Sequence, residues 1–444
     1  MNAVDNQTEI FNKQLAGFID GSPTPFHAVA NIASLLRAAG FQALSEADDW
    51  TLKQGEKYFV TRNGSSIIAF VAGSEDLAES GIRMAGAHTD SPCLMVKPQP
   101  EMLNNNYFQL GVEVYGGALL NPWFDRDLSL AGRLVYSDAS GQLKLKLINF
   151  DEAIAIIPSL AIHLDRTANT ERTINTQTDI PPILMQADKK TDFRELLAER
   201  FLSDDEKVLD YELCFYDVQG AATLGLNKEF FAAARLDNLL SCFVATQAII
   251  HSDTTCTSLL VCNDHEEVGS VSSVGADGPF LESVVDRLCD ALCNDARASN
   301  KARVLDGSLL ISCDNAHAVH PNFSAKHEAG HKPALNGGPV IKVNSNQRYA
   351  TNGVTASLFR QLCAEVDVPV QSFVTRTDLG CGSTIGPVTA AKLGIPTLDV
   401  GIPQLAMHSC RELTGTLDPE RLSRVLTQFF NRPGRLQVAD GDTI

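Results

Sequence analysis

The spacing of hydrophobic positions changes along the chain and divides it into three parts. In the first part, apolar residues recur at helical spacing through residues 26–39, which predicts an amphipathic helix that ends at Gly40. Two short apolar runs follow at residues 67–72 and 82–87, and such runs are typical of buried strands. The first part therefore combines a helix with strands.

The second part alternates polar and apolar residues. Its beginning is marked by Pro98, Pro100 and the three asparagines of residues 104–106, which favour a boundary. A polar stretch at residues 169–179 predicts an exposed loop. Alternation of this kind is typical of antiparallel strands, and it predicts them at residues 107–115, 128–136, 142–148 and 211–218.

In the third part, apolar runs alternate with helical patterns. The runs lie at residues 258–262 and 309–313, and the helical patterns at residues 236–250, 281–294 and 354–366. Strands that alternate with helices favour a mostly parallel sheet with helices on both faces.

These three parts predict an α/β protein with an insertion. We expect one α/β domain, a mostly parallel sheet flanked by helices, built from residues 1–93 and 234–444. A smaller β-rich domain, residues 94–233, is inserted into it. A chain of 444 residues has ample length for two or three domains.

Composition and net charge argue against several classes of function. The 36 basic and 54 acidic side chains give a net charge of −18, which argues against binding to nucleic acid or to a membrane surface. The same charge, taken alone, also disfavours an enzyme for acidic substrates. No apolar run is long enough to span a membrane, and residues 1–5 are not expected to begin a secretory signal.

The eleven cysteines are an odd number, and many lie in apolar runs, as Cys262 does. Cys289 and Cys293 have helical spacing rather than the close pairing of a zinc-binding motif. We expect buried, reduced thiols in a cytoplasmic protein.

Polar clusters follow the predicted strands or open the predicted helices, where open α/β sheets bind their ligands. They lie at residues 88–90, 235–238, 263–267, 313–315 and 407–409. Histidines and several carboxylates in such positions fit a shared metal site, because imidazole and carboxylate groups suit zinc and one carboxylate can bridge two ions.

Individual residues in these clusters also have simpler explanations. His88 could be a hydrogen-bonded core histidine, and Asp237 could be an acid at a helix N-terminus. As parts of one site, they have sharper roles. Asp90 lies two residues after His88 and could hold its second ring nitrogen. The adjacent Glu266 and Glu267 offer one metal ligand and one uncoordinated general base.

Residues 327–331, HEAGH, match the zinc-binding helix motif H-E-x-x-H letter for letter. That motif requires both histidines on one helical face, whereas Gly330 inside it and Pro333 beyond it disfavour a helix. We therefore expect the metal site elsewhere. The glycine-rich residues 380–384 could either cradle an anion at a helix start or form a plain turn.

Taken in order, these motifs resemble the M18 family of metallo-aminopeptidases, the aspartyl aminopeptidases, along essentially the whole chain. The matching stretches are residues 18–29, 86–92, 161–164, 235–238, 264–270, 312–321, 338–349 and 407–409. So many ordered matches make the resemblance specific.

The resemblance implies a site with two zinc ions, for which cobalt or manganese could substitute. It implies that one zinc is held by His88 and Asp314, the other by Glu267 and His408, with Asp237 bridging them, Glu266 as general base and Asp90 as the partner of His88. The implied reaction is hydrolysis of N-terminal residues from peptides.

The resemblance also implies substrates and partners. Lys342 and Tyr349 match residues that bind an acidic side chain, so a preference for N-terminal Asp or Glu is expected. His163 matches a histidine that reaches a neighbouring subunit's active site, and it has a provisional second role as a zinc ligand. A homo-oligomer is implied, a dodecamer built from dimers.

Two other functions stay open from the sequence. One is a di-zinc hydrolase of the same fold with broad aminopeptidase specificity or with activity on acylated amino acids. The other is a non-catalytic assembly protein, although the intact set of candidate ligands and Glu266 weighs against it.

Overall fold

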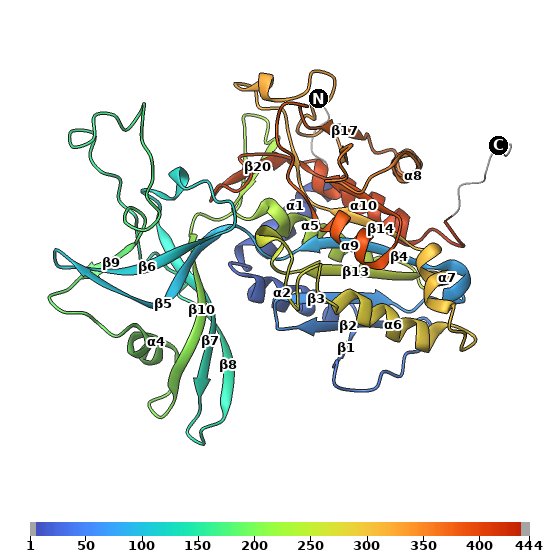
Figure 1. Cartoon of the computed structure of the whole chain (residues 1–444), viewed down its shortest axis with the longest axis horizontal. Coiled ribbons are helices and arrows are strands. Elements are labelled where there is room, and N and C mark those ends of the chain that lie inside the picture. Colours follow the sequence, from blue (N-terminus) through green and yellow to red (C-terminus); the bar gives the residue numbers. More distant parts are fainter. Residues whose placement is uncertain (1–5, 437–444) are drawn as a thin grey trace.

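The computed structural model describes residues 6–436, so the expectation about residues 1–5 lies outside the described residues. Figure 1 shows two lobes, with a large helix-covered sheet on the right and a sheet of long strands on the left. Among the described residues, no helix is both long and apolar enough to cross a membrane.

The right lobe is built on a nine-stranded sheet. Its order is β1 (Gln42–Leu44), β2 (Lys57–Arg62), β3 (Ser66–Val71), β13 (Thr257–Asn263), β4 (Ile82–His88), β14 (Leu309–Cys313), β18 (Thr397–Gly401), β16 (Val340–Val343) and β17 (Gln371–Val374). The central strands β13, β4, β14 and β18 pair in parallel, whereas β2–β3, β3–β13 and β16–β18 pair antiparallel. The predicted mostly parallel sheet is confirmed.

Helices cover both faces of this sheet (Figure 1). One face packs against α1 (Asn6–Asp20), α2 (Pro25–Ala38), α5 (Leu236–Ile250), α8 (Gly353–Glu365) and α10 (Asp418–Phe430). The other packs against α3 (Leu77–Ser80), α6 (Phe280–Leu292), α7 (Asn300–Asp306) and Leu393 of α9 (Ile385–Leu393). Strand β4 contributes Ala85 and Ala87 to the first core and Ile82 and Met84 to the second, as alternation of side chains along a strand requires.

The left lobe contains a six-stranded antiparallel sheet with its own apolar core. Its order is β8 (Leu143–Asn149), β7 (Leu128–Ser137), β10 (Lys207–Asp217), β5 (Cys93–Asn104), β6 (Tyr107–Tyr115) and β9 (Ile183–Gln186), and α4 (Phe193–Phe201) packs against β10. The sheet spans nearly the same stretch as the predicted insertion, whose boundaries stay a prediction.

A third, five-stranded sheet connects the two parts of the chain. It contains β11 (Ala222–Leu224), β12 (Phe230–Ala233), β20 (Glu412–Gly415), β19 (Pro403–Leu405) and β15 (Ala316–His317). The last residues of the predicted insertion therefore pair with β20, a strand from near the C-terminus, rather than with the six-stranded sheet.

The parallel strands bring distant polar residues to one edge. His88, at the end of β4, pairs with Asn263 at the end of the neighbouring β13, and β14 ends on the other side of β4 at Cys313. The residues that follow these strands therefore meet at the carboxyl edge of the sheet, where ligands bind in open α/β folds.

Candidate metal centre

His88 is buried at the end of β4, and its two ring nitrogens face different partners. Nδ1 donates to the backbone carbonyl of Asp90 at 3.0 Å and lies 3.3 Å from the Asp90 carboxylate. Nε2 lies 3.4 Å from Asp237 Oδ1 and 3.9 Å from Asp314 Oδ1. Because Nδ1 donates to the Asp90 carbonyl, Nε2 is the ring nitrogen that faces the two carboxylates and is available to a metal ion.

His408 repeats this arrangement on the other side of Asp237. Its Nδ1 donates to the carbonyl of Gly117 at 3.1 Å. Its Nε2 lies 3.3 Å from Glu267 Oε1 and 3.6 Å from Asp237 Oδ2. The two oxygens of Asp237 therefore face two different histidines, the arrangement expected of a carboxylate that bridges two ions.

These atoms fit a pair of small cations. Three groups of candidate ligand atoms occur among the described residues: His88, Asp237 and Asp314; Asp237, Glu267 and His408; and His88, Glu266 and Glu267. Ligands about 2.0–2.2 Å from zinc in tetrahedral geometry are roughly 3.3–3.6 Å apart, close to the separations seen here. Glu267 Oε1 is also buried and has no hydrogen-bond partner within the described part of the chain, so a cation would satisfy it.

Asp90 connects the histidine to the glutamates. Its two carboxylate oxygens accept the backbone N–H groups of Glu266 and Glu267, each at 3.1 Å, at the start of the short 3-10 helix η2 (Glu266–Val268). One of them also accepts the hydroxyl of Tyr115 at 2.6 Å. Asp90 therefore orients both His88 and the segment that carries the two glutamates.

The protein groups alone carry too much negative charge for this buried position. Burial raises the pKa of Glu266 to about 7 and that of Glu267 to about 9, and the nearby Asp237 adds to both shifts. Burial by itself would lower the pKa of His408, but hydrogen bonding to Asp237 and the charge of Glu267 raise it to about 9. His88 is likewise raised well above its usual pKa, against its burial, by hydrogen bonds to Asp237, Asp314 and Asp90. A site that holds protons so firmly is suited to divalent cations.

A cavity of about 390 Å³ opens beside the cluster. Lys342, which is 3% exposed, lies on its wall and donates to the carbonyl of Asn315 at 2.9 Å. Its ammonium is 3.4 Å from Asp314 Oδ2 and 5.1 Å from the centre of the Tyr349 ring. The other lining residues include His317, Gly382, Ser383, Thr384 and Met407. The cavity is therefore lined by carboxylates and by a buried cation.

Among the predicted site residues, His163 lies away from the cluster of candidate metal ligands. It is exposed in a turn that follows β8, and it belongs to none of the groups of candidate ligand atoms found in residues 6–436. This segment extends from the left lobe in Figure 1.

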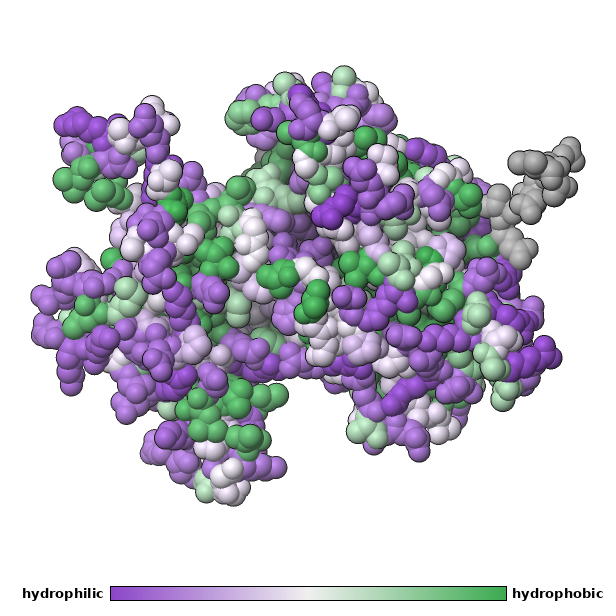
Figure 2. Space-filling model, in the orientation of Figure 1, coloured by the Kyte–Doolittle hydropathy of each residue, from purple (hydrophilic) through white to green (hydrophobic). Residues whose placement is uncertain are grey.

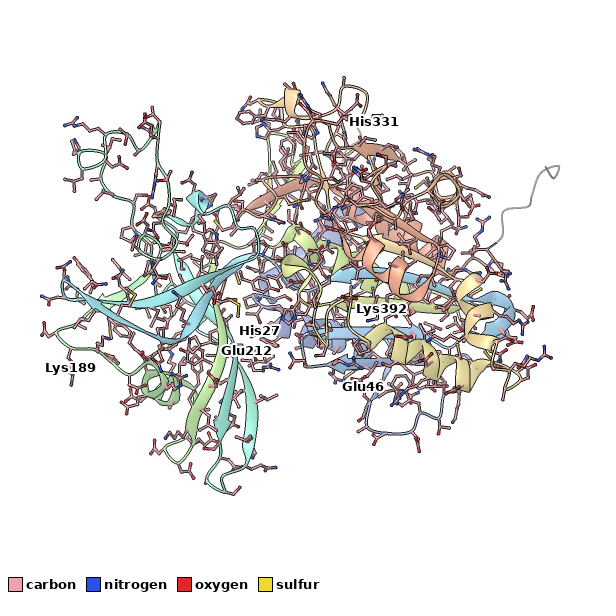
Figure 3. The ribbon with its side chains drawn as sticks, in the orientation of Figure 1. His27, Glu46, Lys189, Glu212, His331 and Lys392 are labelled. Carbon is pink, nitrogen blue, oxygen red and sulfur yellow. The ribbon has the colours of Figure 1, made fainter. Side chains whose placement is uncertain are left out.

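Residues 327–331 form no helix. The 3-10 helix η3 (Ser324–Lys326) ends before them, and His331 Nδ1 contacts Glu328 at 2.5 Å. Figure 3 shows His331 at the top of the molecule, in a surface loop. The candidate ligand groups among the described residues include neither histidine of this motif.

The sequence did not single out three groups that hold the cluster together: the hydroxyl of Tyr115, the carbonyl of Gly117 and the carboxylate of Glu412. Tyr115 and Gly117 come from the end of β6 and the residues after it, so the left lobe contributes directly to the site. Neither Tyr115 nor Gly117 lies in a sequence motif that would have pointed to the site. Glu412 lies four residues after His408, and that proximity was its one available signal.

The fold and the cluster together define a metal-dependent enzyme of the α/β class, and comparisons with known proteins specify the family. Residues 18–430 match the family described as aminopeptidase I zinc metalloprotease (M18). A probable M18 family aminopeptidase 2 from Pseudomonas syringae is 56% identical over 425 residues, which cover 94% of this chain and 97% of that protein. The chain belongs to the M18 family of zinc aminopeptidases, metallo-hydrolases that act on N-terminal residues.

Solved structures agree with this assignment. The chain is similar to one described as the Ape4 and Nbr1 complex, with a TM-score of 0.92, 39% identity, and coverage of 97% of this chain and 87% of the other. It is also similar to a structure of the S. cerevisiae mApe1 dodecamer, with a TM-score of 0.83, 30% identity, and coverage of 96% of this chain and 97% of the other.

Proposed function

We propose that this chain removes N-terminal Asp and Glu residues from peptides, with two zinc ions and Glu266 as general base. The observation that carries the proposal is the position of Asp237, whose two carboxylate oxygens face His88 and His408 separately, at 3.4 and 3.6 Å. Two histidines served by one carboxylate support two adjacent cations rather than one.

In this proposal His88 and Asp314 hold one zinc, Glu267 and His408 hold the other, and Asp237 bridges them. The group formed by His88, Glu266 and Glu267 shows that Glu266 also lies within reach of the centre. When bound, zinc supplies Lewis-acid chemistry, lowering the pKa of water towards about 7 and offsetting charge on the substrate carbonyl.

Glu266 is suited to moving the proton. Its carboxyl lies within reach of the centre and is not a proposed ligand, so it is available to accept a proton as a general base. Glu266 takes a proton from the attacking water and passes it to the leaving amine of the peptide. Asp90 holds Glu266 for this task through the backbone N–H.

The cavity supports a preference for acidic residues. Lys342 is buried in its wall beside Tyr349, and a buried ammonium makes strong charge-assisted hydrogen bonds to a carboxylate. The net charge of −18 does not oppose this, because several of its acids face the proposed zinc ions. The local charge at the cavity, not the total, determines which side chains bind.

One observation supports a broader specificity as the second candidate. Lys342 already contacts Asp314 and the Asn315 carbonyl, so part of its bonding capacity is in use. A di-zinc aminopeptidase that accepts apolar N-terminal residues, or a hydrolase of acylated amino acids, would fit a Lys342 whose role is only to hold Asp314.

A substrate panel distinguishes these candidates. Protein stripped of metal is assayed on Asp-, Glu- and Leu-anilides and on N-acetylated Asp, each with zinc, cobalt or manganese added back. The proposal predicts recovery with zinc and faster cleavage of the Asp- and Glu-anilides. Equal rates on the Leu-anilide favour broad specificity, and cleavage of the acetylated amino acid alone favours the acyl hydrolase. No activity with any metal favours the non-catalytic assembly protein.

We infer that the chain self-associates, as a dodecamer built from dimers. The dodecameric relative at 30% identity supports this, as does the exposed position of His163, which is suited to contacting a neighbouring subunit. Cysteine usage favours action in the cytoplasm. Light scattering tests the assembly, with a mass about twelve times the 48.0 kDa of one chain as the expected result.

A further inference from the structure

The loops that carry Asp237 and His408 are joined beneath the metal centre by one buried side chain, Glu412 of β20. Its Oε2 accepts the backbone N–H of Asp237 at 2.9 Å, and its Oε1 accepts the backbone N–H of His408 at 2.6 Å. Glu412 is 2% exposed. A single carboxylate therefore contacts the backbones of both the proposed bridging ligand and a proposed ligand of the second zinc.

Two buried amides extend this contact towards Asp314. The Gln404 amide lies 3.4 Å from Glu412 Oε1 and donates to it. Asn315, which follows Asp314 directly, donates from Nδ2 to Gln404 Oε1 and to the carbonyl of Leu236, each at 2.8 Å. Gln404 and Asn315 are both almost completely buried, and their hydrogen bonds span three separate segments of the chain.

We propose that Glu412, with Gln404 and Asn315, forms a positioning network that sets the spacing of the two metal sites. The proposal rests on the proposed di-zinc function. None of the three side chains is a proposed ligand, yet Glu412 contacts the backbones of two ligands and Asn315 lies next to a third. Partners of this kind orient metal ligands, and their loss typically lowers metal affinity about 10- to 100-fold.

A buried polar cluster could instead serve stability alone, so the test must separate zinc affinity from stability. Glu412→Gln keeps the shape of the side chain but replaces one acceptor oxygen with an amide that cannot accept a hydrogen bond. Either the Asp237 or the His408 N–H then faces a donor. We expect zinc affinity to fall about 10- to 100-fold.

Asp418 provides a matched control. It is fully buried, and its carboxylate accepts two backbone N–H groups, those of Asn336 at 2.6 Å and Gly338 at 2.9 Å. Asp418→Asn makes the same chemical change at a carboxylate that contacts no proposed ligand. This variant is expected to lose thermal stability while binding zinc within about twofold of the unchanged protein.

The experiment measures zinc dissociation constants by chelator competition, at a temperature where every variant is folded, together with the midpoint of thermal unfolding. Weaker zinc binding in Glu412→Gln but not in Asp418→Asn supports the network. Unchanged binding in Glu412→Gln, or an equal loss in Asp418→Asn, overturns it.

If Glu412→Gln does not fold, Gln404→Met serves in its place. This variant removes the link to Asn315 and leaves both backbone contacts of Glu412 intact, so a smaller, few-fold loss of zinc affinity is expected and unchanged affinity overturns the proposal. Wild-type protein that binds zinc without cleaving peptides would contradict only the proposed function. The positioning network would stand, because it is tested by zinc affinity and not by activity. Protein that takes up no zinc would contradict both.

Discussion

Asp237 is the side chain on which the proposed centre depends most. It is 3% exposed, and each of its carboxylate oxygens faces a different histidine. Burial alone would raise its pKa, but hydrogen bonds with His408 and His88 hold that pKa below its usual range. Its negative charge is therefore retained in the protein interior, where a bridging ligand needs it.

The first prediction at this scale concerns Glu266→Gln. This substitution removes the proton acceptor and keeps the size of the side chain, so kcat should fall about 10²- to 10⁴-fold. Zinc content, measured by atomic absorption, should stay as in the unchanged protein, because Glu266 is not proposed as a ligand. A variant that keeps a tenth of the activity would refute the role of Glu266.

The second concerns Lys342→Met, which removes the buried ammonium from the cavity wall. Hydrogen bonds to charged groups contribute about 1.5–3 kcal/mol, so kcat/KM for the Asp-anilide should fall about ten- to hundredfold. The Leu-anilide is the internal control, because its side chain makes no such bond. Equal losses on both substrates would mean that Lys342 acts only by holding Asp314.

The side chains proposed as ligands could be predicted because each follows a strand or opens a helix and has the chemistry of a metal ligand. The groups that support them could not. Tyr115 reaches Asp90, and Gly117 reaches His408, only because β6 of the left lobe folds against the edge of the large sheet. No local sequence pattern encodes such a tertiary contact.

Among the secondary-structure elements, strands β4, β13 and β14 position the site, because their parallel ends present their following residues side by side. The neighbouring β18 packs closely against the segment after β14. A Cβ atom on Gly401, at the end of β18, would lie 2.1 Å from the carbonyl oxygen of Asp314. That position has no room for a side chain.

Gly401→Ala is therefore predicted to destabilise the protein by about 1–3 kcal/mol through overpacking, and to weaken zinc binding by displacing Asp314. Gly17→Ala in α1 is the matched control, since among the described residues its added Cβ would meet nothing within 4 Å beyond its chain neighbours and the backbone of its own helix. The control should be neutral or stabilising by up to about 1 kcal/mol. Thermal unfolding measures both, and a Gly401→Ala protein as stable as the control would contradict the packing argument.

Long elements with clear periodicity were predicted well. The predicted bounds of α5, β6 and β14 agree with those of the structure, because burial of one face or of both leaves a regular pattern. The five-stranded sheet was not predicted, since its strands are short and pair across large separations, as β12 does with β20. The absence of a helix at residues 327–331 was predicted from Gly330 and Pro333, despite the match to a zinc motif.

For the whole molecule, protonation of the centre should couple to stability. In metal-free protein the folded-state pKa values of Glu266, Glu267 and His408 all lie above their usual values, at about 7, 9 and 9. The folded state then binds more protons than the unfolded state, so stability falls as pH rises through this range. Zinc bound by Glu267 and His408, as proposed, would replace the protons of those two groups.

We therefore expect the thermal midpoint of stripped protein to fall between pH 6.5 and 9, and that of zinc-loaded protein to change less. The gap between the two should widen as pH rises. Calorimetry at several pH values measures this gap in thermal midpoint. Parallel curves for stripped and loaded protein would contradict the prediction, because they would show that zinc does not displace the protons of these groups.

The surface of the molecule agrees with self-association. Figure 2 shows an apolar area at the lower left, where Figure 1 places β7 and β8. Leu143, Leu145 and Leu147 of β8 are 67%, 62% and 40% exposed, and β8 is an edge strand of its sheet. Exposed apolar patches and free sheet edges favour contacts between proteins.

The most direct test of the account is anomalous diffraction at the zinc edge from crystals of zinc-loaded protein. The account predicts two peaks, one on each side of the Asp237 carboxylate, the first beside His88 and Asp314 and the second beside Glu267 and His408. A single peak at Asp237, or zinc bound at His327 and His331 instead, would contradict it.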